Sequence, residues 1–201
     1  MKRKLLGLAR TAALLGAALL ALTAPASAGT LSGKKILLVV APSNFQDREY
    51  LTCRDIFEAD GASVSVAGIN LEEARGMSGT RISPDLALKD VDPTKYDAVV
   101  FIGGPGATMY WDHAEARRIA LAASESNKVV GAICLAPVIV ARAGVLSGKD
   151  CTVWPDANRE MSEAGCNYKK KDVVVAGKVI TANGPDAAAD FARAVEKALG
   201  K

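Results

Sequence analysis

The stretch that decides the fold is VVGAICLAPVIV, residues 129–140. A run of β-branched residues ends abruptly at Cys134, and a helix-forming apolar run begins immediately after it. This pattern predicts a strand, a sharp turn at Cys134 and a helix. It is the thiol counterpart of the nucleophile elbow, which raises a reactive side chain above the carboxyl edge of a parallel sheet. A buried structural cysteine fits the same residues, so the rest of the chain must decide between the two.

Strands and helices alternate on both sides of this stretch. Most of the strands are continuous apolar runs, which is typical of a parallel sheet covered by helices on both faces. We therefore predict an α/β three-layer sandwich with a mainly parallel sheet. Strands are expected at 34–41, 63–67, 96–102, 128–133, 151–154, 173–176 and 178–182, helices at 46–60, 112–126, 135–143, 156–164 and 185–199, a turn at 42–45, a loop or short hairpin at 70–82, and a connector at 85–92.

The N-terminus has the layout of a secretory signal peptide. A basic start, Lys2 to Lys4, precedes a Leu- and Ala-rich core from Ala12 to Leu22 and the small-residue end Ala26-Ser27-Ala28. The apolar core is shorter than the roughly 20 residues of a membrane span. We expect a leader over 1–28, one domain over 29–201, and a periplasmic or secreted protein without stable membrane insertion after cleavage.

The charge balance argues against polyanionic partners. The chain has 25 Lys and Arg and 22 Asp and Glu residues, but four of the basic residues lie in the predicted leader. The remainder therefore has a net charge near −1, which favours neither nucleic acid nor an anionic membrane surface. No His, Cys or Asp cluster has metal-ligand spacing, so no metal is expected.

The four cysteines, Cys53, Cys134, Cys151 and Cys166, are too few for a disulfide scaffold in a chain of this length. If one pair forms a disulfide, the pair Cys151–Cys166 is favoured, because both lie near the starts of consecutive predicted strands. Four reduced thiols are the equal alternative.

Three predicted strand ends carry unusual residues, and the carboxyl ends of parallel strands share one edge of a sheet. At the first, Cys134 lies beside a helix N-terminus, which is expected to lower the pKa of its thiol. At the second, the N–H groups of Gly103 and Gly104 would form an oxyanion hole together with that of Leu135. A tight turn that needs glycine at these two positions is the alternative. The string Gly103 to Gly106 lacks the spacing of a phosphate-binding loop.

The third strand end leads into the helix that carries Glu49. In a partly buried site the pKa of this carboxyl would rise, and it would serve as a general acid/base beside the thiol. An ordinary first-turn glutamate, favoured by the helix dipole, is the alternative. Asp47 and Asp55 are expected to be surface acids.

Two aromatic side chains need separate treatment. His113 follows Asp112, the predicted N-cap whose reciprocal partner would be Glu115, so His113 is expected at the surface. It is the single imidazole of the chain, but no local feature directs it to Cys134. Trp154, at a predicted strand end, would either line the pocket or belong to the core.

Five motifs together resemble the ThiJ/PfpI family, which includes the Parkinson-disease-linked protein deglycase. They are NFQDRE with Glu49, FIGGPG, AICLAP, AGVLSGK and ITANGP, and the resemblance spans about Lys34 to Leu199. It implies a flavodoxin-like fold, dimers or higher oligomers, and no cofactor. It also implies that Cys134 is the nucleophile, that Glu49 is its carboxyl partner, and that the Gly104 and Leu135 N–H groups stabilise an oxyanion.

Two positions depart from the family pattern. Leu135 stands where the peptidase-like branch has a histidine, and Trp154 stands where the glyoxalase and deglycase branch usually has one. A Cys–Glu pair still suffices for a glyoxalase-like reaction, in which a thiolate attacks an aldehyde and Glu49 moves a proton between adjacent carbons. The leading hypothesis is an enzyme acting on small reactive carbonyls. The first alternative is a non-enzymatic redox sensor whose Cys134 reacts with an oxidant, and the second is a peptidase or amidase.

Overall fold

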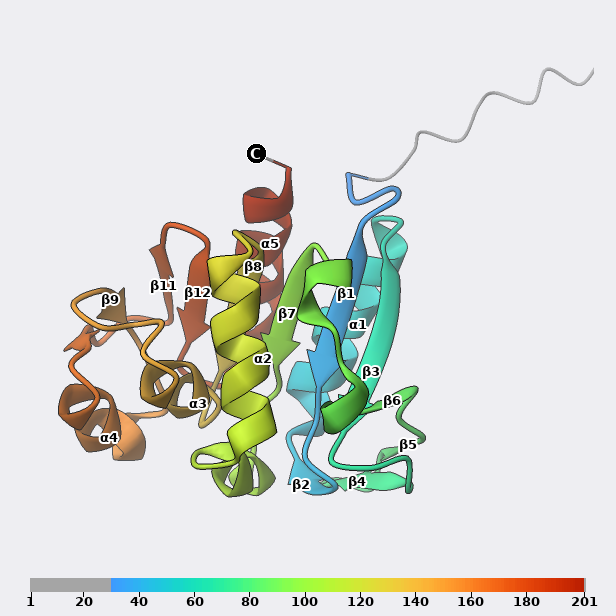
Figure 1. Ribbon diagram of the computed structural model, residues 1–201, viewed down its shortest axis with the longest axis horizontal. Coiled ribbons are helices and arrows are strands. Elements are labelled where there is room, and N and C mark those ends of the chain that lie inside the picture. Colours follow the sequence, from blue (N-terminus) through green and yellow to red (C-terminus); the bar gives the residue numbers. More distant parts are fainter. Residues whose placement is uncertain (1–29, 201) are drawn as a thin grey trace, which may run out of the picture.

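The computed structural model describes residues 30–200, so the predicted leader lies outside the described residues. Its centre is a seven-stranded sheet in the order β11-β12-β8-β7-β1-β3-β6 (Figure 1). All neighbouring strands are parallel except β11 and β12. The strands are β1 (Lys35–Val39), β3 (Ser63–Gly68), β6 (Leu86–Ala87), β7 (Ala98–Phe101), β8 (Val129–Ile133), β11 (Val173–Ala176) and β12 (Val179–Ala182).

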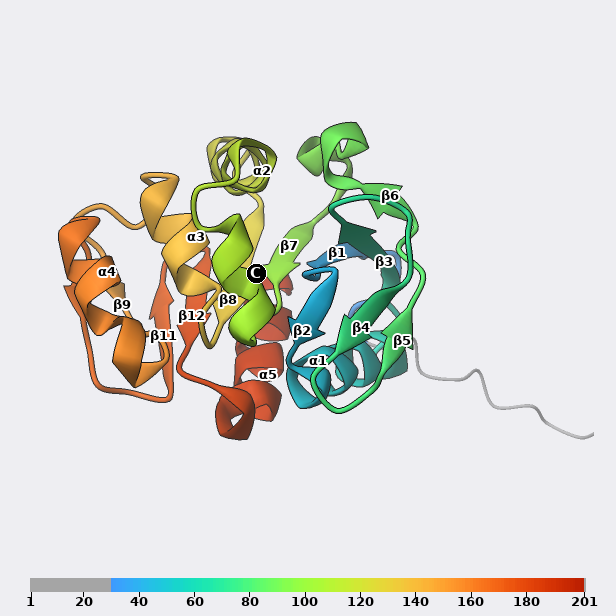
Figure 2. The same ribbon diagram turned by 90° about the horizontal axis from the view of Figure 1, so that it is seen from below.

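Helices cover both faces of this sheet, as the apolar strands require (Figure 2). On one face α1 (Asp47–Ala59) packs beside α5 (Ala188–Leu199), and their Phe57 and Phe191 are fully buried. On the other face lie α2 (Ala114–Glu125) and α3 (Pro137–Arg142). The predicted flavodoxin-like three-layer α/β fold is therefore confirmed. Among residues 30–200, no helix has the length and apolar character needed to cross a bilayer.

Two small sheets flank the large one. The strand β2 (Ser43–Phe45) pairs with the hairpin β4 (Ala74–Gly76) and β5 (Arg81–Ile82), which confirms the hairpin expected within 70–82. The strand β9 (Asp150–Cys151) pairs in parallel with β10 (Asn167–Tyr168) around α4 (Asn158–Glu163). Short 3-10 helices lie at Leu88–Asp90, Pro93–Lys95, Pro105–Tyr110, Pro155–Ala157 and Pro185–Ala187.

Several predicted boundaries are wrong. Residues 43–45 form a strand instead of a turn, because the hairpin supplies a partner for them. The strand expected at 151–154 ends at Cys151, because the N–H of Thr152 donates to Thr181 Oγ1 rather than to a ladder carbonyl. The third predicted helix starts at Pro137 rather than directly after Cys134.

The predicted helix at 112–126 begins with His113 as its N-cap, not Asp112. The Asp112 side chain pairs instead with Arg142 of α3 (2.5 Å), and Glu115 pairs with Arg118 (2.7 Å), so the expected reciprocal cap does not form. For Asp112, a long-range ion pair has replaced the expected local cap, whereas Glu115 pairs within its own helix.

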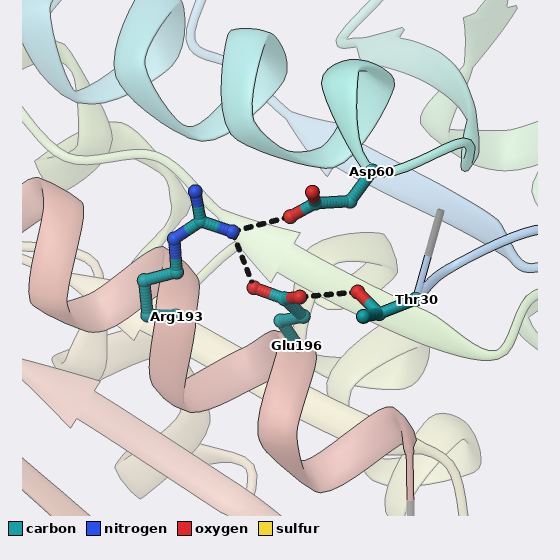
Figure 3. A network of polar contacts seen from close by, with 4 residues as sticks. All are labelled: Thr30, Asp60, Arg193 and Glu196. Atoms are coloured by element: carbon teal, nitrogen blue, oxygen red, sulfur yellow. Dashed lines mark hydrogen bonds and ion pairs between the residues drawn. The ribbon is translucent and has the colours of Figure 1, made fainter. Parts of the chain in front are cut away.

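The start of the described chain packs near the amino ends of the strands, at the opposite end of the sheet from Cys134. Leu31 is fully buried, and Thr30 Oγ1 donates to Glu196 of α5. Arg193 bridges Glu196 and Asp60, the C-cap of α1 (Figure 3). Because Arg193 is more than half exposed, the buried Leu31 contributes more to this attachment than the ion pairs do.

Candidate active site

Cys134 occupies a sharp turn directly after β8, as the sequence predicts. Its φ is 62°, in the left-handed region that costs a non-glycine residue about 1–2 kcal/mol. Two backbone hydrogen bonds hold the strained residue: its N–H donates to the Ala182 carbonyl (2.9 Å), and its carbonyl accepts from the Trp154 N–H (2.8 Å). The turn therefore fixes the thiol at the carboxyl edge of the sheet.

The Cys134 sulfur accepts hydrogen bonds from the backbone N–H groups of Gly104 and Leu135. Gly104 has a φ of 94°, and a Cβ there would lie 2.5 Å from both the Asn44 oxygen and the Gln46 nitrogen, so only glycine fits. Both N–H groups lie where the sequence places them, beside the position at which a substrate oxyanion would form.

The structure places the second expected donor, Gly103, differently. Its N–H donates to Glu49 Oε2 (2.9 Å) rather than to the sulfur. A Cβ at Gly103 would lie 2.5 Å from Cys134 Cβ and 2.7 Å from Glu49 Oε2, so glycine is what lets thiol and carboxyl approach each other. We correct its expected role from oxyanion donor to spacer and carboxyl anchor.

Glu49 is fully buried and lies within hydrogen-bonding reach of the Cys134 side chain. Of the two carboxyl oxygens of Glu49, Oε1 has no hydrogen-bond partner with good geometry among the described residues. Burial raises the pKa of this carboxyl to about 8, against the opposing effects of the Gly103 N–H and the Cys134 side chain. The group is therefore protonated at neutral pH, as the sequence predicts for a buried site.

The expectation of a lowered pKa at Cys134 is wrong. Burial and the negative charge of ionised Glu49 raise the pKa of the thiol to about 12, although the Gly104 and Leu135 N–H groups oppose the rise. Since the repulsion exists only when Glu49 is ionised, the two groups titrate as a pair. The first ionisation of the pair, near pH 8, is that of Glu49, and the ionised carboxyl then opposes loss of the Cys134 proton.

A cavity of about 200 Å³ opens above the sulfur. Trp154 lies at its mouth with 39% of the residue exposed, so this side chain lines the pocket and is not part of the core. None of the lining side chains is charged. The lining residues are Gln46, Met77, Gly104, Pro105, Cys134, Leu135, Trp154 and Pro185.

Met77 reaches the pocket from the β4–β5 hairpin, and Asp47 holds that hairpin in place. The Asp47 carboxylate accepts from the N–H groups of Ser78 (2.7 Å) and Thr80 (2.8 Å). Because Asp47 is buried, its prediction as a surface acid is wrong, whereas Asp55 is exposed as expected. The sequence signal that was missed is the polar turn of the hairpin, whose N–H groups need an acceptor.

His113 does not line the pocket. Its partly buried ring stands edge-on to Tyr110 at a centroid distance of 5.7 Å. The structure thus brings together Cys134, Glu49, Gly104, Leu135 and Trp154, and leaves the imidazole outside. Among residues 30–200, no group of three or more His, Cys, Asp or Glu side chains has the geometry to hold a metal ion.

The DJ-1/PfpI family model matches residues 34–198, nearly the whole described chain. The chain belongs to the DJ-1/PfpI family. An uncharacterised protein of Methanocaldococcus jannaschii is 40% identical over 85% of each chain. A glutathione-independent glyoxalase of Caenorhabditis elegans is 29% identical, over 83% of this chain and 89% of that protein. The crystal structure of a ThiJ/PfpI domain protein from Brachyspira murdochii is similar, with a TM-score of 0.80, 34% identity, and coverage of 82% of this chain and 95% of that one.

Proposed function

We propose that this member of the family is a cysteine-dependent enzyme that converts small, uncharged reactive carbonyls such as methylglyoxal. The observation that carries the proposal is the pairing of a buried, protonated Glu49 with the Cys134 thiol. A carboxyl with a pKa near the working pH can both accept and donate a proton. Relatives named as glyoxalases or deglycases support the same reaction class.

The reaction needs only this pair and water. In the singly ionised pair, Glu49 takes the Cys134 proton as the sulfur attacks the aldehyde carbon, and the aldehyde oxygen takes the negative charge beside the Gly104 and Leu135 N–H groups. Glu49 then returns the proton to that oxygen, which gives a hemithioacetal and leaves the carboxyl ionised. The Glu49 carboxylate removes the proton from that carbon, the hydroxyl proton passes to the neighbouring oxygen through an enediol, and Glu49 returns its proton to the adjacent carbon, which leaves a thioester. Water then hydrolyses the thioester to lactate and restores the thiol. Methylglyoxal and one water account for all atoms of lactic acid.

The uncharged pocket sets the substrate class. Because no lysine or arginine lines the cavity, a substrate carboxylate or phosphate would lose its hydration without gaining a counter-ion. Small neutral dicarbonyls avoid this cost. Export through the leader at 1–28 and homodimer formation stay predictions from the sequence.

The test is lactate production from methylglyoxal by the wild type and by Cys134→Ser, Glu49→Gln and Asp55→Asn. Asp55 is an exposed acid on the same helix as Glu49, which makes it the matched control. We expect Cys134→Ser and Glu49→Gln to lose about 10²–10⁴-fold in kcat/KM, and Asp55→Asn to match the wild type. Turnover that survives in either active-site variant, or equal inactivity of all four proteins, would refute the Cys–Glu mechanism.

The redox-sensor function is the second candidate, and the same geometry favours it. A Cys134 sulfinate would accept hydrogen bonds from the Gly104 and Leu135 N–H groups and from protonated Glu49. Titration with peroxide and intact mass measurement separates the two candidates. A sensor stops at two added oxygens on Cys134 and shows no lactate production. The peptidase or amidase ranks third, because Leu135 replaces the histidine and no imidazole reaches the pocket.

A further inference from the structure

Cys151 and Cys166 form a second sulfur centre, separate from Cys134. Both belong to the core cluster packed with α2 and α3, whereas Cys53 and Cys134 belong to the cluster on the α1 and α5 side. All four cysteines of the chain lie within the described part. Each of these two sulfurs therefore has the other as its partner within the same core cluster.

The strand pair β9 and β10 brings these two cysteines together. In the parallel register, Asp150 lies opposite Asn167 and Cys151 lies opposite Tyr168. Cys166 therefore neighbours Lys149, and its side chain lies on the same face of the pair as that of Cys151. The backbone on both sides is held by N–H donation from Asn167 to the Lys149 carbonyl (2.9 Å) and from Lys169 to the Cys151 carbonyl (2.7 Å).

The two thiols are in contact but unequal. The two side chains lie within hydrogen-bonding reach of each other, and this contact lowers the pKa of Cys166 and raises that of Cys151. Cys151 is fully buried, while Cys166 is 7% exposed. Cys166 is thus the thiol that reaches solvent and ionises first, with Cys151 behind it as a resolving thiol.

We propose that Cys151 and Cys166 are a redox-active dithiol that a hydroperoxide converts into an intramolecular disulfide. The Cys166 thiolate attacks one peroxide oxygen, the O–O bond breaks, and the other oxygen leaves as an alcohol or water. The Cys151 sulfur then attacks the resulting sulfenic acid, and hydroxide leaves with the Cys151 proton as water. Two electrons pass from the two thiols to the peroxide.

The bridge closes the segment that carries one wall of the pocket. Residues 152–165 lie between the two cysteines and include Trp154, whose N–H donates to the Cys134 carbonyl. Closing a loop of this length restricts the unfolded chain. We expect oxidation to raise the Tm by about 6–12 °C for a domain of this size.

The test uses Cys134→Ser protein, in which the proposed nucleophile is absent, so the result does not depend on the carbonyl reaction. After treatment with hydrogen peroxide, we expect the intact mass to fall by two hydrogens and the alkylatable thiols of the denatured protein to fall from three to one. A peptide map without reductant should show Cys151 linked to Cys166.

Two variants in the same background serve as controls. Cys166→Ala should abolish both the mass loss and the Tm rise, and Cys151→Ala should accumulate a Cys166 sulfenic acid that dimedone traps. The wild-type peptide map provides the same test without any substitution, should either variant fail to fold. Oxygen addition at Cys166 without a link to Cys151, or a link to Cys53, would overturn the proposal. So would a wild-type protein in which this pair does not react at peroxide levels that oxidise Cys134.

Discussion

Asp47 and Glu49 lie in the same turn of α1, and both are buried, yet their surroundings move their pKa values in opposite directions. Burial raises the pKa of Asp47, but hydrogen bonds from the Thr80 side chain and from the Ser78 and Thr80 N–H groups outweigh it, so the net pKa is lowered. Glu49 has one N–H donor, from Gly103, and its pKa rises to about 8.

The difference shows what separates a carboxylate that holds the fold together from a carboxyl group that can take part in a reaction. Asp47 accepts enough hydrogen bonds to remain ionised, and these hydrogen bonds hold the hairpin that carries Met77. Glu49 has too few donors to stay ionised at neutral pH, and it lies beside a thiol whose pKa its charge raises. Burial alone is common to both, so the number of donors decides the role.

The largest expected effect is a gain in stability at alkaline pH in Glu49→Gln. Because the folded pKa of Glu49 lies above its ordinary value of 4.5, the wild type loses stability as the pH rises from about 4.5 to about 8. Relative to the wild type, Glu49→Gln should gain about 2–5 kcal/mol between pH 4 and pH 9. Urea unfolding at both pH values checks this. A constant difference between the two proteins would mean that Glu49 is ionised in the folded state.

Asp47→Asn should show the opposite sign and a smaller effect. The folded pKa of Asp47 is lowered, so its contribution is present above its ordinary value of 3.8 and is lost as the pH falls. We expect about 1–3 kcal/mol of destabilisation at pH 7, shrinking below pH 4, and a raised KM for methylglyoxal through a loosened Met77. Unfolding curves and steady-state kinetics test both; unchanged stability at pH 7 would show that the hairpin does not depend on this charge.

The shared titration of Glu49 and Cys134 should appear in the alkylation of the thiol. The rate of Cys134 modification by iodoacetamide is expected to rise about tenfold per pH unit up to about 8 and then to level, because above that pH the ionised Glu49 opposes loss of the thiol proton. In Glu49→Gln the break should move away from pH 8. Stopped-flow measurement of the alkylation rate of both proteins over a pH series tests this. Identical pH profiles would argue against coupling between Glu49 and Cys134.

The smallest effect belongs to the residue between the two carboxyls. Arg48 pairs with Asp186 at 2.6 Å, but the two side chains are 62% and 96% exposed. Solvent screening makes such a pair worth less than about 1 kcal/mol, so Arg48→Ala should leave the Tm nearly unchanged. Calorimetry on Arg48→Ala and Asp47→Asn compares the two variants directly. A fall in Tm as large in Arg48→Ala as in Asp47→Asn would mean that the exposure of a side chain does not predict its contribution to stability in this turn.

Much of the site is predictable because the signals that carry it are local. The apolar run before Cys134 and the helix former after it define the elbow, and the paired glycines mark a close approach of two strand ends. The place of Glu49, one turn into a helix at the same sheet edge, allowed a pairing with Cys134 but left an ordinary first-turn glutamate as the alternative. The thiol pKa was predicted with the wrong sign, because the helix-terminus effect was considered without the desolvation and the Glu49 charge that the fold imposes.

The sequence alone determined the parallel α/β fold and the elbow at Cys134, because hydrophobic periodicity and glycine positions act over a few residues. Only the tertiary structure decided that Gly103 anchors the carboxyl, that Asp47 is buried, and that Cys151 touches Cys166. These facts depend on donors and neighbours from segments far apart in the chain. Burial, hydrogen-bond supply and sulfur contact are set by packing, which no local pattern records.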